Sequence, residues 1–260
     1  MIDFEFVKPS TVADAVKALA ADGAQALSGG QTLTPTMKQR LATPSVLVSL
    51  NGIAAMRGVT VSGGTVTVGA ATTHATVARE AGAYPALAAL AGGIGDMAVR
   101  NRGTIGGSLA NNDPAACYPS AVLGSGATVV TNARSIAADD FFQGMFTTAL
   151  DEGEIITGVS FPVPMKAAYV KFNQPASRFA LTAVFVAQYA DGVRVAVTGA
   201  SNNGVFRWSE AEAALSANFS AAAIAGLVVA SDDMIADMHG TAAYRANLVK
   251  VLTGRAVSAA

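Results

Sequence analysis

The spacing of apolar residues along the chain predicts an alternation of short strands and short helices. Phe4 and Phe6 alternate with acidic residues, which is the pattern of a half-buried strand. Val12, Val16 and Leu19 recur at helical spacing. The same reading predicts further strands at 24–27, 44–50, 58–61, 65–68, 127–131, 134–137, 154–163, 169–172, 182–190 and 193–200. It predicts further helices at 35–41, 73–81, 85–91, 121–123, 139–142, 210–215, 221–230 and 242–256.

Turn residues divide these elements into a mixed part and a later antiparallel part. Ser62-Gly63-Gly64 is expected to join two alternating strands as a hairpin. Asn51-Gly52 is expected to form a turn after the preceding strand, because both residues tolerate left-handed backbone conformations. Pro162 and Pro164 end a strand and form the strongest candidate domain boundary. Beyond them, helices are expected to cover one face of an antiparallel sheet that turns at Asp191-Gly192. We predict an α+β fold with segments 1–54, 55–163 and 164–260.

Two glycine-containing segments have the composition of a phosphate-binding backbone. Residues 28–32 read SGGQT after a short apolar strand, and residues 104–108 read TIGGS. Glycine allows close approach to a ligand, and successive N–H groups of such a turn form a concave anion site. Taken singly, each glycine pair is more often a tight turn than a cofactor loop. Together they indicate a dinucleotide that is held from both sides.

A third glycine segment matches the dinucleotide fingerprint in its letters but not in its context. Gly93, Gly95 and Ala98 satisfy the pattern G-x-G-x-x-A, and Asp113 lies about where the acidic residue of that fingerprint is expected. A Rossmann fingerprint follows a strand and opens a helix. Here an alanine-rich helical run precedes the glycines and Arg100-Asn101-Arg102-Gly103 follows them. We therefore do not expect a Rossmann fold.

The composition indicates a globular chain whose surface is partly covered by partners. Hydrophobic residues make up 52% of the 260 residues and charged residues only 13%, which is little charge for a free monomer. The net charge of −1 argues against nucleic acid and membrane surfaces as partners. No signal-like or membrane-spanning run is found, so we expect a cytoplasmic location. The lone Cys117 and two histidines form no metal-ligand set, so any metal is expected on another chain.

The two glycine segments, read with their flanks, resemble the FAD loops of a known family. Residues 26–33 read ALSGGQTL, residues 100–110 read RNRGTIGGSLA, and residues 237–248 contain DMHG followed by YRANL. These stretches resemble the flavoprotein subunit of molybdenum hydroxylases, which include aerobic carbon monoxide dehydrogenases and xanthine dehydrogenase. The resemblance covers the whole chain. It implies a fold of the vanillyl-alcohol-oxidase type to about residue 163, with FAD between two small α/β subdomains, and then a C-terminal domain.

The resemblance also implies which residues hold the cofactor. The segment 28–32 would wrap the pyrophosphate, the segment 104–108 would close over it from the other subdomain, and Ile94 would lie near the adenine. The expected cofactor-binding residues are Ala26, Leu27, Ser28, Gly29, Gly30, Gln31, Thr32, Leu33, Ile94, Thr104, Ile105, Gly106, Gly107, Ser108, Asp113, Cys117 and Lys171.

One position departs from the family, and two other residues carry structural interpretations. Cys117 stands where the family usually has an acidic residue, so the ribityl hydroxyls lose an acceptor unless Asp113 or Asn111 replaces it. Cys117 itself is expected to be a small buried residue, because no base is identifiable nearby. His74 is interpreted as a helix-start residue and the sole tryptophan, Trp208, as a packing residue.

The resemblance implies electron transfer as the function. FAD would accept electrons from a [2Fe–2S] small subunit, fed by a molybdopterin-binding large subunit, within a dimer of heterotrimers. Flavin chemistry belongs to the cofactor, and no catalytic residue is assigned. Two alternatives stay open: a self-contained flavin oxidoreductase, which would turn over an organic substrate alone, and a non-catalytic assembly subunit, which would contain no flavin. The substrate and the final acceptor are undetermined.

Overall fold

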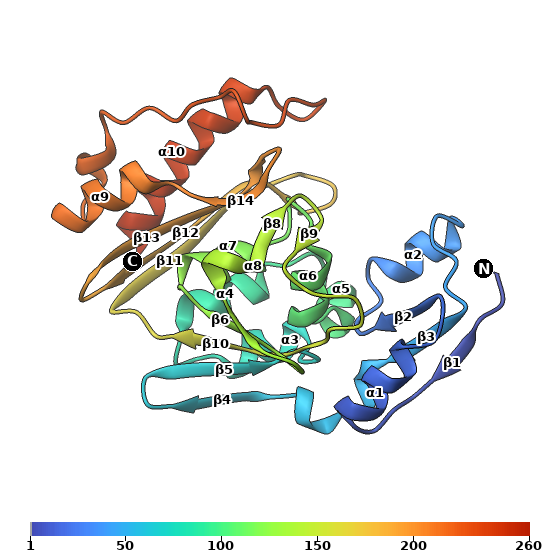
Figure 1. The fold of residues 1–260 in the computed structure, drawn as a ribbon. Coiled ribbons are helices and arrows are strands. Elements are labelled where there is room, and N and C mark those ends of the chain that lie inside the picture. Colours follow the sequence, from blue (N-terminus) through green and yellow to red (C-terminus); the bar gives the residue numbers. More distant parts are fainter. Residues whose placement is uncertain (1) are drawn as a thin grey trace.

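The computed structural model describes residues 2–260, which form three main sheets joined by helices (Figure 1). The first sheet is parallel, in the order β1 (Glu5–Val7), β3 (Val46–Ser49), β2 (Ala24–Leu27). Helix α1 (Val12–Leu19) connects β1 to β2 and packs on this sheet. Helix α2 (Leu33–Lys38) follows β2, so residues 28–32 form the loop between a strand end and a helix start. Short 3₁₀ turns follow at Leu50–Gly52 and Ala54–Met56.

The second sheet is antiparallel and lies in the middle of the chain. Its order is β4 (Val59–Ser62), β5 (Thr65–Gly69), β10 (Ile156–Pro162), β6 (Thr128–Thr131), β7 (Ser135–Ala137). Gly63 and Gly64 take left-handed φ values of 55° and 77° in the β4–β5 turn, which confirms the predicted hairpin. The helices of this part are α3 (His74–Glu80), α4 (Pro85–Gly92), α5 (Met97–Arg102), α6 (Ile105–Asn111), α7 (Tyr118–Gly124) and α8 (Ala138–Phe141). A small hairpin of β8 (Phe142–Gly144) and β9 (Thr147–Thr148) follows α8.

The third sheet is an antiparallel meander near the C-terminus. Its order is β11 (Lys166–Asn173), β12 (Ala180–Tyr189), β13 (Gly192–Ser201), β14 (Gly204–Arg207). Helices α9 (Ser209–Ala217) and α10 (Ala242–Ala259) pack on one face, and α4 and α7 of the middle part contact its strands from the other side (Figure 1). The sequence predicted helices on one face only, because it does not show that the middle part docks on the other.

The alternation of side chains along β12 divides the molecule into two cores. Phe185 and Ala187 belong to the core shared with the middle part, whereas Val184 and Val186 pack under the C-terminal helices. A strand with both faces buried explains why residues 180–187 are apolar almost without interruption. Trp208 is 4% exposed in the second core, which confirms its interpretation as a packing residue.

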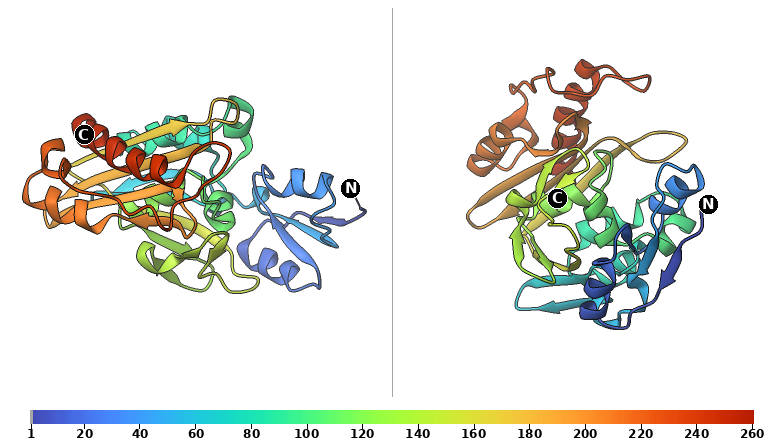
Figure 2. Two further views of the ribbon diagram at one scale, coloured as in Figure 1. Left: turned by 90° about the horizontal axis from the view of Figure 1, so that it is seen from above. Right: turned by 45° about the vertical axis from the view of Figure 1, so that its right-hand side comes forward.

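The three sheets follow one another in space as they do in sequence. Figure 2 shows the first sheet at one end of the molecule and the C-terminal sheet with its helices at the other. The division into segments 1–54, 55–163 and 164–260 stays a prediction. No helix within residues 2–260 combines the length and the apolarity needed to span a membrane.

Three local expectations are wrong. The helix expected over 221–230 is a 3₁₀ turn at Ala221–Ile224, and Val228 beyond it is 85% exposed, so no packed apolar face sustains a helix. Asn51 and Gly52 lie in a 3₁₀ turn without left-handed φ, closed by the N–H of Ile53 donating to Leu50. Strand β1 is largely exposed rather than half-buried.

Candidate functional site

A cavity of about 910 Å³ lies where the first sheet, the helices of the middle part and the loop after β11 meet. Its volume is that of a large cofactor site. Every predicted cofactor-binding residue lines it except Ile105 and Lys171. Segments that are far apart in the sequence therefore meet at one site.

The loop of residues 28–32 presents unused backbone donors to this cavity. Residues 29–32 lie between β2 and α2, and within residues 2–260 no acceptor binds their backbone N–H groups. Gly30 has a φ of 67°, a left-handed conformation that glycine adopts without strain. Consecutive N–H groups without protein partners can bind a phosphate oxyanion directly.

The segment 104–108 is a helix start rather than an open loop. Thr104 caps α6, and its Oγ1 accepts a hydrogen bond of 3.2 Å from the N–H of Gly107. The N–H groups of Ile105 and Gly106 donate to carbonyl groups of the segment 70–72, at 3.3 and 2.9 Å. The expectation that successive N–H groups here form an anion site is therefore wrong, because neighbouring chain already binds them.

The two glycines of α6 have different surroundings. A Cβ on Gly106 would lie 2.7 Å from the Cβ of Ala70, so Gly106 allows close packing of α6 on the chain after β5. Gly107 is exposed on the cavity side, where a Cβ would meet only Oγ1 of Thr104 at 3.1 Å before reaching the other loop. Gly107 and the hydroxyls of Thr104 and Ser108 are what this segment offers a ligand.

Side-chain and backbone contacts join the two segments directly. The hydroxyls of Ser28 and Thr104 lie 2.9 Å apart and share a hydrogen bond. A Cβ on Gly29 would lie 2.5 Å from the carbonyl oxygen of Arg102, so only glycine lets the backbones approach this closely. The amide of Asn51 donates to the carbonyl oxygen of Ser28 at 2.9 Å and holds the first loop from behind. The two predicted glycine segments, 28–32 and 104–108, are thus joined to each other by a hydrogen bond and by close backbone packing.

On another wall of the cavity, Cys117 lies beside a lysine that connects three segments. Cys117 is 6% exposed and lines the cavity, as does Asp113. Nζ of Lys171 donates to the carbonyl oxygens of Gly93 at 2.7 Å and Arg178 at 3.0 Å, and lies 3.6 Å from Sγ of Cys117. Lys171 therefore supports the cavity from outside its lining. Ile105 is fully buried in the core.

His74 lines the cavity as well, although it was interpreted from the sequence only as a helix-start residue. It is the first residue of α3 and is 5% exposed, with its backbone N–H bound to the carbonyl of Gly103 at 2.9 Å. Its ring packs against Tyr118 at 5.3 Å between centroids. Burial, reinforced by the charge of Arg100, lowers the pKa of His74 to about 4. The imidazole is therefore neutral near pH 7 and supports the turn that leads into α6.

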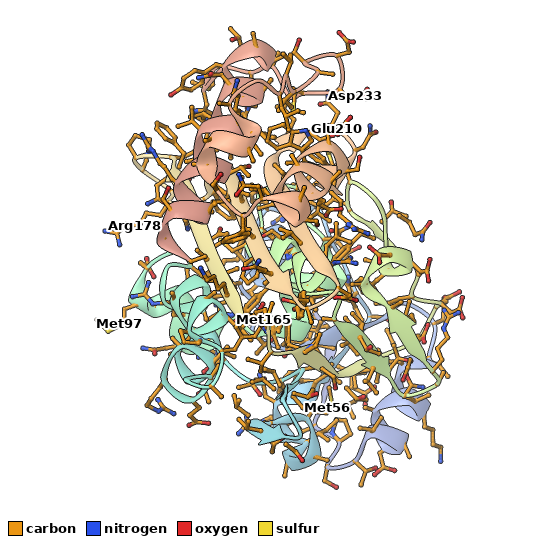
Figure 3. The ribbon with its side chains drawn as sticks, turned by 90° about the vertical axis from the view of Figure 1, so that its left-hand side faces the viewer. Met56, Met97, Met165, Arg178, Glu210 and Asp233 are labelled. Carbon is orange, nitrogen blue, oxygen red and sulfur yellow. The ribbon has the colours of Figure 1, made fainter. Side chains whose placement is uncertain are left out.

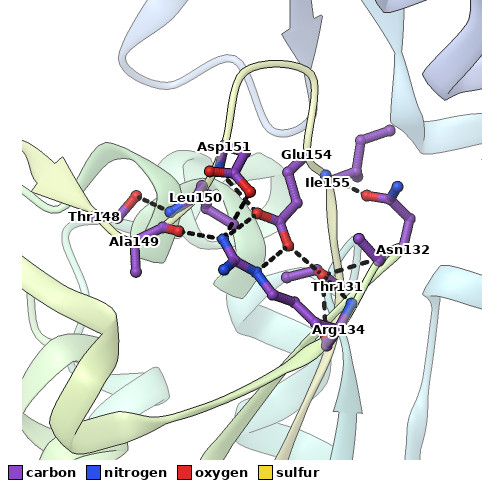
Figure 4. A network of polar contacts seen from close by, with 10 residues as sticks. Thr131, Asn132, Arg134, Thr148, Ala149, Leu150, Asp151, Glu154 and Ile155 are labelled. Atoms are coloured by element: carbon purple, nitrogen blue, oxygen red, sulfur yellow. Dashed lines mark hydrogen bonds and ion pairs between the residues drawn. The ribbon is translucent and has the colours of Figure 1, made fainter.

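An ion-pair network fixes the chain that enters β10 (Figure 4). The carboxylate of Glu154 accepts hydrogen bonds from Arg134 at 2.9 and 3.1 Å, from Oγ1 of Thr131 at 2.6 Å and from the N–H of Asp151 at 2.8 Å. The hydrogen bonds from Arg134 above all lower the pKa of Glu154 to about 2. The carboxylate therefore stays ionised and holds the segment 150–156, which contributes four residues to the cavity lining.

The sequence missed one further wall of the cavity. Residues 176–179, in the loop between β11 and β12, line it together with Asp96 and Val99 at α5. Figure 3 shows Arg178 of this loop and Met97 of α5 at the edge of the same side of the molecule. The loop contains no glycine pair or other motif, so no local signal could have identified it.

The composition of the lining decides which ligand fits. Apolar side chains, a row of free backbone N–H groups and several hydroxyls line the cavity, in which Glu154 is already paired and His74 is neutral. This combination suits a dinucleotide with an anionic centre and an aromatic ring system.

Comparison with known proteins agrees with this geometry. A family model described as FAD binding domain in molybdopterin dehydrogenase matches residues 2–164. The chain is 35% identical over 272 aligned residues to the nicotine 6-hydroxylase medium subunit of Paenarthrobacter nicotinovorans, covering 97% of this chain and 95% of that protein. It is 32% identical over 277 aligned residues to the carbon monoxide dehydrogenase medium chain of Afipia carboxidovorans, covering 99% and 96%.

A solved structure extends the likeness to the whole fold. Carbon monoxide dehydrogenase from Hydrogenophaga pseudoflava, which in that structure lacks the Mo-pyranopterin moiety of its molybdenum cofactor, contains a chain with a TM-score of 0.90. The match has 31% sequence identity and covers 100% of this chain and 98% of that one.

Proposed function

This chain belongs to the family of FAD-binding medium subunits of molybdenum hydroxylases, and we propose that its FAD passes electrons from a [2Fe–2S] subunit to an external acceptor. FAD is the cofactor of this chain, which is one subunit of an oxidoreductase. The observation that supports the electron-transfer role is the row of free backbone N–H groups in the cavity lining, which can hold an anionic redox cofactor. A chain that holds a redox cofactor for electron transfer takes its electrons from a neighbouring donor.

The pyrophosphate of FAD is assigned to the first loop. The free N–H groups of residues 29–32 would each make a charge-assisted hydrogen bond, contributing roughly 1.5 to 3 kcal/mol. Gly107 and the bonded hydroxyls of Ser28 and Thr104 would close the other side. We propose that Ile94 lies near the adenine and that Asp113 or Asn111 supplies the acceptor for the ribityl hydroxyls that Cys117 does not provide. Ile105 and Lys171 act through the neighbours that they support.

Within this arrangement the protein binds and orients while the cofactor performs the redox chemistry. FAD, when bound, can take up and release electrons one or two at a time. The hydroxyl junction between Ser28 and Thr104 holds the two parts at a fixed separation. The His74 imidazole is neutral near pH 7, and the ionised Glu154 carboxylate is fully paired. The roles of this chain in the proposal are therefore to bind and to orient FAD.

The experiment compares the complex with the chain alone. The chain is purified with its co-expressed partners, FAD, iron and molybdenum are quantified, and flavin reduction is followed by anaerobic stopped-flow absorbance after substrate is added. We expect stoichiometric FAD and flavin reduction that requires an iron–sulfur chain and a molybdopterin chain. Rapid reduction of the FAD-loaded chain alone by an organic substrate would identify a self-contained oxidoreductase. A complex without flavin would identify an assembly subunit.

The assembly is the remaining part of the proposal. The relatives are named medium chains or medium subunits of larger enzymes, and this chain spans 95% and 96% of two of them. We infer a molybdopterin-binding large subunit and a [2Fe–2S] small subunit as partners, in a dimer of heterotrimers. The low fraction of charged residues, 13%, is consistent with extensive covered surface. Native mass spectrometry of the complex measures this stoichiometry.

A further inference from the structure

The turn of the β8–β9 hairpin presents two apolar side chains to solvent. Phe146 is 56% exposed and Met145 is 36% exposed. We call residues 144–146 the hairpin tip. Phe146 belongs to neither of the two hydrophobic cores within residues 2–260, so its ring does not serve the packing of this chain.

A single buried residue holds the hairpin tip in place. Asn112 is 1% exposed, and its Nδ2 donates to the carbonyl oxygens of Gly144 and Thr147, each at 2.8 Å. The carbonyl oxygen of Asn112 accepts the backbone N–H of Phe146 at 3.1 Å. Three hydrogen bonds from one side of the turn therefore fix the position of an aromatic ring that points away from the core.

The base of the hairpin is anchored on other elements. Phe142 packs edge-on against Phe141 with ring centroids 5.1 Å apart. Gly204 of β14 lies so close that a Cβ there would be 3.5 Å from the carbonyl carbon of Gly144. The hairpin tip is therefore a rigid projection rather than a loose loop.

The backbone of the hairpin tip is unusual for its sequence. Phe146 has a φ of 56°, a left-handed conformation that is rare for a bulky residue. Such a conformation persists only where the surrounding structure determines it, and it is concentrated at functional sites. An asparagine or glycine would occupy this position with less strain, so an exposed phenylalanine here calls for a contact outside the chain.

We propose that the hairpin tip is a docking knob for the iron–sulfur subunit; this inference rests on the function proposed above. Asn112, which holds the tip, lies between Asn111 and Asp113, and both of these line the cofactor cavity. An electron donor must approach that cavity closely. A rigid aromatic anchor fixed to the cavity wall is placed where such a donor would dock, and pre-organised aromatic residues are typical interface hot spots.

The surroundings of the hairpin tip define the complementary surface. The exposed residues Asn202 and Asn203 precede Gly204, next to the tip, and the N–H of Asn202 is bound by the carbonyl of the exposed Asp233 at 2.8 Å. An apolar centre with a polar, partly acidic rim is the usual anatomy of an interface. The partner surface should carry a pocket for one aromatic ring, with basic or amide groups at its edge.

The test uses Phe146→Asn in the full chain, co-expressed with its partner subunits. Asparagine tolerates left-handed φ, so this variant should fold with an unchanged or higher melting temperature and full FAD content. We expect about 10- to 100-fold weaker association with the iron–sulfur chain, measured by dilution and native mass spectrometry. Met238→Gln, at a 93% exposed apolar residue elsewhere, is the matched control and should leave assembly unchanged.

Each outcome decides one question. Unchanged iron–sulfur association in Phe146→Asn, in a complex whose parent chain carries FAD and an iron–sulfur partner, would overturn the docking knob and leave the proposed function intact. Selective loss of the molybdopterin chain would also overturn it, because the tip would then face the other subunit. A parent chain that never associates with an iron–sulfur protein would instead contradict the proposed function.

Discussion

The two glycine segments that meet at the cavity differ in the fate of their backbone N–H groups. In the first loop, the N–H groups of residues 29–32 have no acceptor within the described part of the chain. In the second segment, the N–H groups of Ile105, Gly106 and Gly107 are bound by carbonyls of the segment 70–72 and by Thr104. Two segments of nearly the same composition therefore differ in the number of backbone N–H groups that they can offer to an anion.

The difference shows that a glycine pair has more than one physical use. In the first loop, Gly29 permits close approach of another backbone and Gly30 permits a left-handed turn, and the donors stay free. In α6, Gly106 is buried and is required by packing against Ala70, whereas Gly107 is exposed on the cavity side. The first loop is thus the segment whose N–H groups are available to an anion, whereas the N–H groups of the second are already bound within the protein.

The largest effect is expected when the two glycines of α6 are replaced one at a time. Gly106→Ala places a Cβ 2.7 Å from the Cβ of Ala70 and 2.8 Å from its carbonyl oxygen, so the free energy of unfolding should fall by about 1 to 3 kcal/mol. Gly107→Ala should change the melting temperature little, because alanine favours helix and its methyl group makes one tight contact, 3.1 Å from Oγ1 of Thr104. It should nevertheless weaken FAD binding about tenfold, because its methyl group enters the cavity.

Urea unfolding and flavin titration measure these two effects separately. Equal stability of the two variants would remove the distinction between a packing glycine and a cavity glycine. Full retention of flavin by a folded Gly107→Val chain would show that this helix start does not face the cofactor.

A pH experiment tests whether His74 supports the second glycine segment, residues 104–108. Burial lowers the pKa of His74 from 6.5 to about 4, so folding favours the neutral imidazole. Its contribution to stability is complete above pH 6.5 and is lost as the pH falls toward 4, by up to about 3 kcal/mol. His74→Leu should therefore flatten the fall in unfolding free energy between pH 6.5 and 4.

The second histidine supplies the control. His239 is exposed, so His239→Gln should retain the pH dependence of the parent. If His74→Leu and the parent lose stability in parallel between these pH values, the titration of His74 is not what weakens the turn before α6.

A smaller effect is expected at the junction between the two segments. Ser28→Ala removes the 2.9 Å hydrogen bond to Thr104 without adding bulk, and a single hydrogen bond contributes about 1 kcal/mol. FAD should then dissociate about fivefold faster in flavin-release fluorescence measurements. Thr104→Ser keeps the hydroxyl and is expected to match the parent. An equal acceleration in both variants would contradict a role for the hydrogen bond.

The smallest effect on FAD binding is expected at Cys117, which lines the cavity outside both glycine segments. Cys117→Asp introduces a strong acceptor beside the Lys171 ammonium group, whose Nζ lies 3.6 Å from Sγ of Cys117. FAD affinity should stay equal or rise by up to about threefold in equilibrium titration. A tenfold loss of affinity would show that the pocket has been rebuilt around the thiol. The flanking loops would then not be the only determinants of binding.

Most of the fold could be predicted from the sequence because its signals are local. The period of apolar residues located α1, β2, the β4–β5 hairpin and strands β11, β12 and β13 of the third sheet, but not β14. The expected helix over 221–230 failed because alanine content alone does not provide an apolar face to pack. For the site, the glycine segments identified both sides of the cavity, whereas residues 176–179 carried no motif.

The sequence by itself determined the order of most elements, the two glycine segments that line the cavity and the family to which the chain belongs. Only the tertiary structure decided which segment keeps its N–H groups free, because the competing carbonyls come from the segment 70–72, remote in sequence. It also decided that Lys171 braces the cavity from outside, since its acceptors at Gly93 and Arg178 lie on different elements. Hydrogen-bond partners depend on which strands and helices pack together, and that information is spread over the whole chain.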